Sequence, residues 1–201
     1  SNYLIAELRD HHTQPASDER VMPISSTASD FWSAAATVIR TATTVSTSSL
    51  RICTPYLVTD RVLEHSLIAA KKRGVDITIT VPDPPNSDSK LAALAAINCL
   101  PRLLQHGITV FAYEPTLIHR KCLVINDEVA IIGSVNFNQR SQRKDDEFCL
   151  LIDKGATVEK LIGDFEQDRN YARQLDPSEF QRRHFFLGKA ARLIDPFRQH
   201  I

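Results

Sequence analysis

The chain lacks the cysteine spacings that typically hold a metal ion. Its four cysteines, which lie in apolar runs without a CxxC pair or a suitably spaced histidine, are Cys53, Cys99, Cys122 and Cys149. Unpaired cysteine is among the most frequently buried residue types. We therefore expect four buried, reduced thiols rather than a metal site, which favours a reducing compartment.

An excess of either charge is also missing. Lys and Arg together number 24, as do Asp and Glu, so the formal net charge is +0. A neutral balance excludes general attraction to nucleic acid or anionic lipid, so an anion site must be local. No apolar run reaches the ~18 residues of a membrane span, and the first residues show no signal-peptide pattern. We expect a soluble chain whose 201 residues suffice for one domain.

Helical and strand patterns alternate along most of the sequence. The apolar spacing predicts helices over 31–42, 60–74, 89–107, 157–175 and 177–197. Between them, strands are predicted over 50–58, 75–82, 108–113 and 146–152. This order predicts an α/β fold, in which a mixed, largely buried β-sheet carries helices on both faces. Residues 1–26 are polar and irregular, and we interpret them as an arm or linker before a single domain over 27–201.

A hairpin over 119–133 combines apolar strands with charged residues. His119 and Lys121 are two positions apart in a strand-like run, so their side chains share one face. A buried cation without a partner costs several kcal/mol, so a negative group should lie against this pair. A short connection at 126–128 leads into the return strand, VAIIG. The start of the first strand and the end of the second are therefore neighbours.

This hairpin predicts a phosphate site. Gly133 lets the backbone approach a ligand closely, while Ser134 offers a hydroxyl and Asn136 an amide. Lys121 supplies the positive charge, and His119 is the group able to act as a nucleophile or proton carrier near neutral pH. An HxK alone is more often an exposed strand edge, and GSxN alone is a plausible turn. Their occurrence together in one hairpin favours a site.

An acidic residue is expected to hold the imidazole in one tautomer. Glu147 opens the next strand at the same end of the sheet and is the candidate for this role. Asp145 and Asp146 are equally charged, and we expect them to be solvated.

These residues resemble the HKD motif of the phospholipase D superfamily. The matching positions are His119 and Lys121, then Gly133, Ser134 and Asn136, then Arg140 and Ser141, and finally Glu147. Most of the chain is similar to the C-terminal half of bacterial cardiolipin synthases, although residues 1–26 show no such match. One departure is Asn126, which stands where the family has Asp and is followed by Asp127. We expect it to affect support of the hairpin more than the chemistry.

The resemblance implies a two-step phosphoryl transfer without a metal ion or cofactor. One histidine forms a phosphohistidine while a second protonates the departing alcohol. None of the other six histidines repeats HxK. The second HKD half would come either from the same longer chain, which the start at Ser1-Asn2 without Met favours, or from a second copy in a homodimer.

The substrate suggested by the resemblance is a phospholipid such as phosphatidylglycerol. We therefore expect a peripheral protein on the cytoplasmic face of a membrane. The neutral charge makes nucleic acid a less favoured partner, yet a homodimeric endonuclease stays an alternative. A half-domain that binds phosphate without turnover is another.

Overall fold

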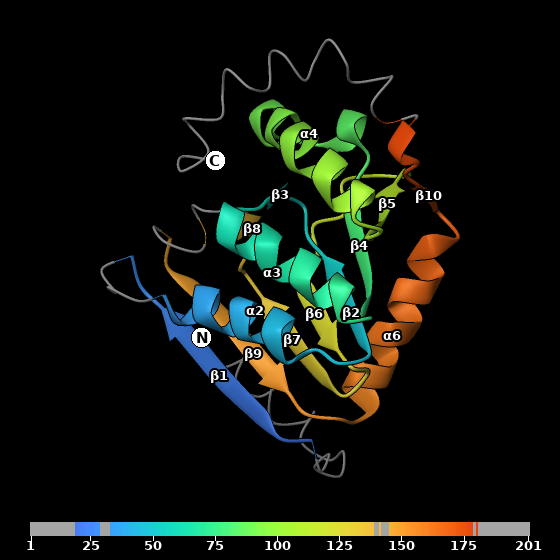
Figure 1. The fold of residues 1–201 in the computed structure, drawn as a ribbon. Coiled ribbons are helices and arrows are strands. Elements are labelled where there is room, and N and C mark those ends of the chain that lie inside the picture. The colour runs from blue at the N-terminus through green and yellow to red at the C-terminus, as the bar shows by residue number, and fades with distance from the viewer. Residues whose placement is uncertain (1–18, 29–32, 139–140, 142–144, 179, 181–201) are drawn as a thin grey trace.

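An eight-stranded sheet forms the middle layer of the fold, in the order β1-β9-β7-β6-β2-β4-β5-β10 (Figure 1). The computed structural model describes residues 19–28, 33–138, 141, 145–178 and 180. The strands of the sheet are β1 (Val21–Ser26), β2 (Ser49–Cys53), β4 (Asp76–Pro82), β5 (Thr109–Tyr113), β6 (Cys122–Ile125), β7 (Val129–Gly133), β9 (Glu147–Ile152) and β10 (Ala172–Gln174). Two short strands, β3 (Leu57–Val58) and β8 (Phe137–Asn138), pair in parallel beside it.

Strands of both directions meet at β2, in the interior of the sheet. β2 pairs in parallel with β4, and β4 with β5. On its other side β2 pairs antiparallel with β6, which places Cys53 opposite Cys122. The carboxyl ends of β2, β4 and β5 therefore share one edge with the beginnings of β6 and β9 and the end of β7. We call this the site edge, because ligands of open α/β sheets bind beyond such carboxyl ends.

Helices cover both faces of the sheet, as predicted. One face carries α2 (Ala34–Val45), α3 (Arg61–Lys72) and α4 (Lys90–Gln105), and the other carries α6 (Ala156–Arg169) (Figure 1). A short 3₁₀ helix, η1 (Pro84–Asn86), precedes α4. The first three α-helices begin at side-chain caps, in which Ser33, Asp60 and Ser89 each accept a hydrogen bond from the backbone N–H three residues on. The mixed α/β fold is confirmed.

Alternation along β6 divides its side chains between two apolar cores. Leu123 and Ile125 join the core beneath α2, α3 and α4. Cys122 and Val124 pack instead with Phe165 of α6. Because both faces are covered, all four residues of β6 are buried, which explains its continuous apolar sequence.

Two segments differ from the expectations drawn from sequence. Val21–Ser26, expected to be irregular, form β1, which pairs antiparallel with β9 at the edge of the sheet. Most of its residues are exposed, so this strand needs no alternating apolar pattern, and Pro23 is tolerated on an edge. The division into an arm over 1–26 and a domain over 27–201 stays a prediction.

The helix expected over 157–175 is shorter than predicted. It ends at Arg169, and Ala172–Gln174 form β10 against β5. The apolar pattern after residue 169 is thus satisfied by sheet pairing rather than by another helical turn. The helix expected over 177–197 lies outside the described residues beyond Phe180.

All four cysteines are buried and free, which confirms the prediction made for them. In the described part of the chain, no helix is both long enough and apolar enough to cross a bilayer.

Candidate functional site

His119 and Lys121 lie side by side at the site edge, immediately before β6. The Lys121 ammonium donates a hydrogen bond to the His119 carbonyl oxygen at 2.9 Å, and its Nζ also lies 2.9 Å from His119 Nδ1. His119 is exposed, whereas Lys121 is partly buried. The two groups are therefore adjacent, as their spacing predicted, and the imidazole is open to a ligand.

Two carboxylates provide the negative charge expected near Lys121. Burial lowers the pKa of Lys121, while the charges of Glu147 and Asp88 act in the opposite direction. Glu147 belongs to β9 and Asp88 to the loop before α4. An ammonium with reduced access to water gains more from an approaching anion than a fully hydrated one does.

Ser134 and Glu147 contact each other across β7 and β9. The Ser134 hydroxyl donates a hydrogen bond to the Glu147 carboxylate and accepts one from the Phe148 N–H at 3.0 Å. The Ser134 N–H donates to the Phe148 carbonyl at 2.9 Å. Glu147 is thus fixed beside the phosphate-binding candidates, and its expected bond to His119 stays a prediction.

Asn136 lies in the loop that follows β7. Its side-chain N–H₂ donates to the Ser141 hydroxyl at 3.2 Å, while its buried Oδ1 has no partner among the described residues. The Ser141 N–H in turn donates to the Asn138 side chain at 2.9 Å. Arg140, the remaining matched position, lies outside the described residues. A role for Asn136 in binding phosphate stays a prediction.

Gly133 is required by the neighbouring strand. A Cβ at this position would lie 2.2 Å from the Phe148 carbonyl oxygen and 2.6 Å from Cys149 Cα. Gly133 pairs directly with Cys149 in the sheet. The close approach that we expected for a ligand is therefore made by the backbone of β9, so this glycine supports the motif.

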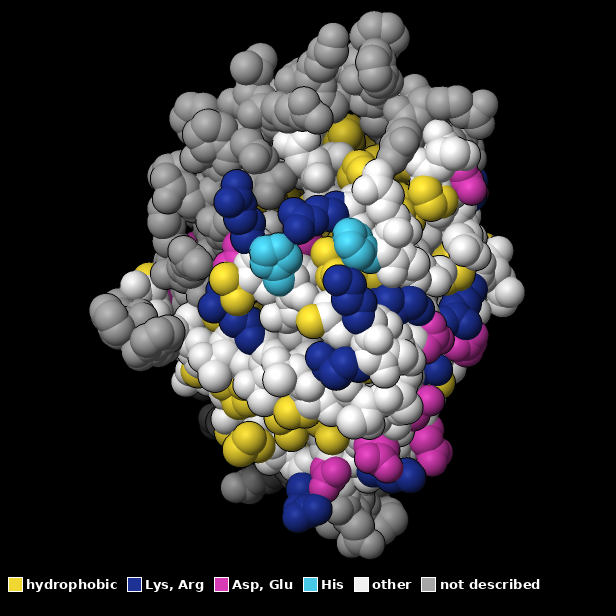
Figure 2. Space-filling view, viewed as in Figure 1, with side chains coloured by type: hydrophobic (Ala, Val, Ile, Leu, Met, Phe, Trp, Pro, Cys, Tyr) yellow, Lys and Arg dark blue, Asp and Glu magenta, His cyan; other side chains and the backbone are white. Residues whose placement is uncertain are grey.

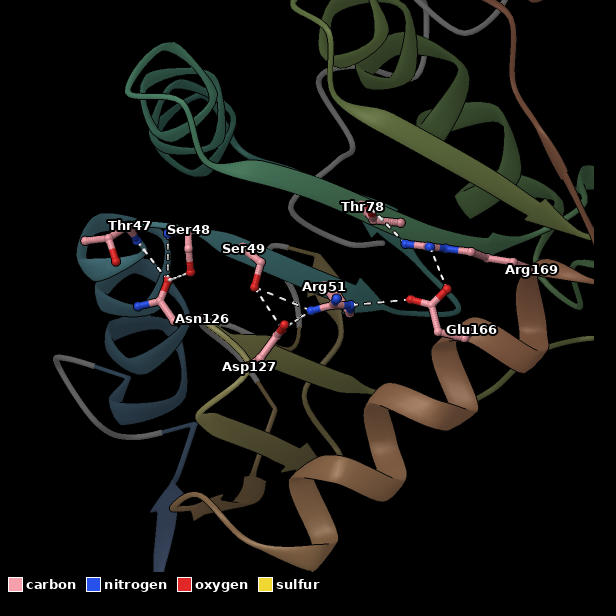
Figure 3. Close-up of polar contacts among 9 residues, drawn as sticks. All are labelled: Thr47, Ser48, Ser49, Arg51, Thr78, Asn126, Asp127, Glu166 and Arg169. Carbon is pink, nitrogen blue, oxygen red and sulfur yellow. Dashed lines mark hydrogen bonds and ion pairs between the residues drawn. The ribbon is translucent and has the colours of Figure 1, made fainter.

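The hairpin turn opposite the site edge is held by Asn126 and Asp127. Both residues have a left-handed backbone, with φ of 54° and 59°, as in the tight turns that suit right-twisted strands. Asn126 Oδ1 accepts hydrogen bonds from the N–H groups of Thr47 and Ser48, at 2.9 and 3.0 Å (Figure 3). Asn126 therefore ties the hairpin to the start of β2, and its role in supporting the motif stays a prediction.

Asp127 extends this anchor to the helix on the other face. Its carboxylate pairs with Arg51 of β2, whose Nε lies 3.9 Å from Glu166 of α6 (Figure 3). Glu166 also pairs with Arg169 at 2.7 Å. The turn, β2 and α6 are thus joined by a chain of charges far from His119.

Sequence reasoning missed Tyr56 and Asp88, which join the site from two loops. The Tyr56 ring meets the His119 imidazole edge to face, with centroids 6.2 Å apart. Its hydroxyl donates to Asp88 at 2.6 Å. Burial and the nearby Asp88 carboxylate raise the pKa of Tyr56 to about 12. Neither residue belongs to the hairpin motif, so spacing alone could not identify them.

Arg120, between the two motif residues, points away from them toward α6. Its guanidinium pairs with Asp168 and lies 3.7 Å from Asp164. The same group stacks over the Phe165 ring, at 5.4 Å from the centroid. Arg120 therefore attaches the segment that carries His119 and Lys121 to the helix behind it.

Comparisons with known proteins identify the family of the chain. Residues 38–169 match the family model described as cardiolipin synthase, PLD-like domain. The minor cardiolipin synthase ClsB of Bacillus subtilis (strain 168) is 34% identical over 147 residues, which cover 70% of this chain and 36% of that protein. The cardiolipin synthase of Geobacillus kaustophilus is 30% identical over 151 residues, covering 74% and 30%. The chain spans about a third of the length of these relatives.

Solved structures share the fold. Nuc from Salmonella typhimurium, a phospholipase D family member, superposes with a TM-score of 0.64 at 23% identity, covering 79% of this chain and 99% of that chain. The phosphatidylserine synthase of Haemophilus influenzae gives a TM-score of 0.66 at 19% identity, covering 100% and 54%. These identities are low, so this likeness establishes the fold alone. The family match over residues 38–169 and the relative that is 34% identical show that the chain belongs to the cardiolipin synthase, PLD-like domain family of the phospholipase D superfamily.

Proposed function

We propose that the chain supplies one HKD half of an enzyme that transfers or hydrolyses the phosphodiester of a phospholipid. The observation that carries this proposal is the placement of an exposed His119 imidazole beside the partly buried Lys121 ammonium at the site edge. A nucleophile and a positive charge within one hydrogen bond of each other suit attack on an anionic phosphorus centre.

The proposed reaction has two steps. A ring nitrogen of His119 attacks phosphorus, the bond from phosphorus to the departing alcohol breaks, and a second imidazole protonates that alcohol. An incoming alcohol or water then attacks phosphorus, breaks the bond to His119, and gives its proton to the second imidazole. Lys121 balances the negative charge of the phosphate throughout. Ser134 and Glu147 are the candidates for holding the phosphate oxygens and the imidazole.

The second imidazole must come from another HxK segment. It belongs either to a longer chain that contains this one or to a second copy related by a twofold axis. Proteins of both sizes occur among the matches, because the matched segment makes up only 36% and 30% of the two curated relatives, while the Nuc chain is matched over 99% of its length. Both arrangements bring two histidines to one phosphate.

A phospholipid is favoured as substrate by the family and by the charge of the chain. The two relatives described above, at 34% and 30% identity, carry the name cardiolipin synthase, and phosphatidylglycerol is the donor that we propose. A homodimeric endonuclease and a non-catalytic phosphate-binding half are the alternatives. The formal net charge of +0 gives the chain no general attraction to a nucleic acid strand, which weakens the first of these.

Trapping the covalent intermediate tests the proposal. The protein, with and without its native upstream sequence and over a range of concentrations, would be mixed with phosphatidylglycerol labelled in its phosphate and quenched in alkali. We expect label on His119, its loss in His119→Ala, and its retention in His106→Ala. Labelling that requires upstream sequence indicates a longer enzyme, and labelling that rises with concentration indicates a dimer. Absence of label in every preparation would overturn the proposal, and cleavage of DNA instead of lipid would favour the endonuclease.

A further inference from the structure

One face of the molecule collects basic side chains although the whole chain is neutral. In Figure 2, Lys and Arg side chains surround two histidines over α3 and the end of α4, while acidic side chains gather along α6. We define the α3 face as the basic side chains on this surface, which are Arg61, His65, Lys71, Lys72, Arg73, Arg102 and His106. Because the formal net charge is +0, a surface rich in Lys and Arg means that the acidic residues lie elsewhere on the molecule.

Few carboxylates neutralise the α3 face. Arg61 and Lys72 are exposed and pair with no carboxylate in the described part of the chain. Arg73 donates to the backbone carbonyls of Thr43, Thr44 and Ser46 at the end of α2, so its charge meets carbonyl dipoles and not a carboxylate. Glu64 pairs with Arg102 at 2.9 Å, but its side chain is only 7% exposed.

Most acidic side chains of α6, unlike Arg61 and Lys72 of α3, have partners of opposite charge. Asp164 pairs with Lys160, Asp168 with Arg120, and Glu166 with Arg169. Thus three of the four carboxylates of α6, all but the exposed Glu159, form ion pairs within the fold. On the α3 face, Lys71 and Arg102 are paired, whereas Arg61 and Lys72 pair with no carboxylate among the described residues. The contrast within one chain argues that the basic surface faces an external anion.

We infer that the α3 face docks on an anionic membrane surface. A broad patch of separate cations on a helix suits the negative potential of a lipid leaflet, where each Lys or Arg improves binding by about fivefold. Most large apolar residues of α3, including Leu63, Leu67 and Ile68, are in the core, and Val62 is the one that is exposed. The α3 face therefore binds the lipid head groups by electrostatic attraction and does not insert into the bilayer. This attraction is largely screened beyond ~10 Å in 0.1 M salt.

This docking surface is distinct from the site that carries the proposed reaction. It rests on charges of the helical layer and not on His119, so binding is measured without turnover. The test is sedimentation of the full chain with vesicles of phosphatidylcholine, with and without about one third phosphatidylglycerol. We expect binding to the anionic vesicles alone, with loss of binding as the salt concentration rises.

Paired variants separate the location of charge from its amount. Arg61→Glu with Lys72→Glu reverses two charges on the α3 face, and Lys154→Glu with Lys160→Glu makes the same change on the opposite side of the sheet. We expect the first pair to weaken vesicle binding by about 25-fold or more, from two lost contributions of about fivefold each. The second pair should bind almost as wild type does. Circular dichroism and thermal melts would confirm that both pairs fold.

Several outcomes would overturn the inference. Equal losses in both pairs would mean that net charge matters and location does not. Full binding by the α3 variant would place the contact elsewhere. Binding of duplex DNA in preference to anionic vesicles, or head-to-tail association of the basic face with α6 of another copy in sedimentation velocity runs, would assign the face to a different partner. None of these results bears on whether His119 forms a phosphohistidine.

Discussion

The ammonium of Lys121 is partly buried, so a nearby negative charge stabilises it strongly. Glu147 and Asp88 supply this charge within the chain, and burial nevertheless leaves the pKa of Lys121 below its ordinary value. A phosphate entering beside His119 would add to the charge that these carboxylates provide. Lys121 is therefore the local anion site that we propose in a protein without net charge.

The first prediction concerns Tyr56, whose hydroxyl bonds to Asp88. Spectrophotometric titration of phenolate formation should show one tyrosine with a pKa of about 12. Its folded pKa is above the ordinary value of 10.0, so this group stabilises the fold fully below pH 10 and loses its contribution as pH rises toward 12.

Asp88→Asn should lower the pKa of Tyr56, because it removes the nearby negative charge and weakens the hydrogen bond. Tyr56→Phe, which keeps the ring against His119, serves as the control because its spectrum should lack this late transition. A wild-type protein whose tyrosines all titrate near pH 10 would contradict the contact.

At the scale of the strand, Gly133 decides whether β7 and β9 can pair. Gly133→Ala places a methyl group 2.2 Å from the Phe148 carbonyl oxygen, so the strands must separate. We expect a loss of more than about 3 kcal/mol in the free energy of unfolding, measured with urea.

Gly163 is the matched control for this substitution. It lies in α6, and a Cβ there would meet nothing within 4 Å. Gly163→Ala should raise stability by roughly 0.5–1 kcal/mol, because alanine is the better helix former. Similar losses in both variants would show that the backbone clash at Gly133 is not the cause.

The attachment of the motif segment to α6 gives a third prediction. Arg120→Ala leaves Asp168 partly buried without its cation, and we expect a loss of about 1–3 kcal/mol in urea unfolding. Burial already raises the pKa of Asp168 while Arg120 opposes this effect, so the variant raises it further.

A raised carboxyl pKa favours the folded state at low pH and loses this effect as pH rises. The deficit of Arg120→Ala should therefore shrink when the pH falls through the raised pKa of Asp168. Arg120→Lys, which keeps the charge, should lose less at neutral pH. A deficit that is independent of pH would indicate lost packing on Phe165 instead.

Many of the strands and turns around the candidate site were predictable from sequence, because their patterns are local. The HxK spacing, the short turn at Asn126 and the apolar run of β6 are local patterns, and each predicted its feature correctly. β1 and β10 were missed because they are edge strands that depend on partners far along the chain. Tyr56 contacts His119 from one loop, Asp88 bonds to Tyr56 from another, and only the folded sheet brings those loops together.

At the scale of the whole molecule, burial of the cysteines in the two apolar cores leads to a prediction about thiol labelling. All four cysteines are buried, so a reagent has little access to any of them. Burial also raises the pKa of Cys149, whereas a hydrogen bond with Cys122 lowers the pKa of Cys53. Under native conditions labelling by a disulfide reagent should be slow for all four. In denaturant all four should react at once, and the urea midpoint for labelling should match that for circular dichroism. Rapid reaction of one thiol in the native protein would reveal local opening of its core.

The central position of β6 also determines when the site can exist during synthesis. β2 is complete at Cys53, but its partner β6 begins at Cys122, and β9, farther along on the same side of the sheet, begins at Glu147. These two strands therefore emerge from the ribosome ~70 and ~100 residues after β2. At about 5–20 residues per second, the exposed edge of β2 waits several seconds for a partner. A nascent chain arrested before Glu147 would therefore offer chaperones an open sheet edge and no complete phosphate site.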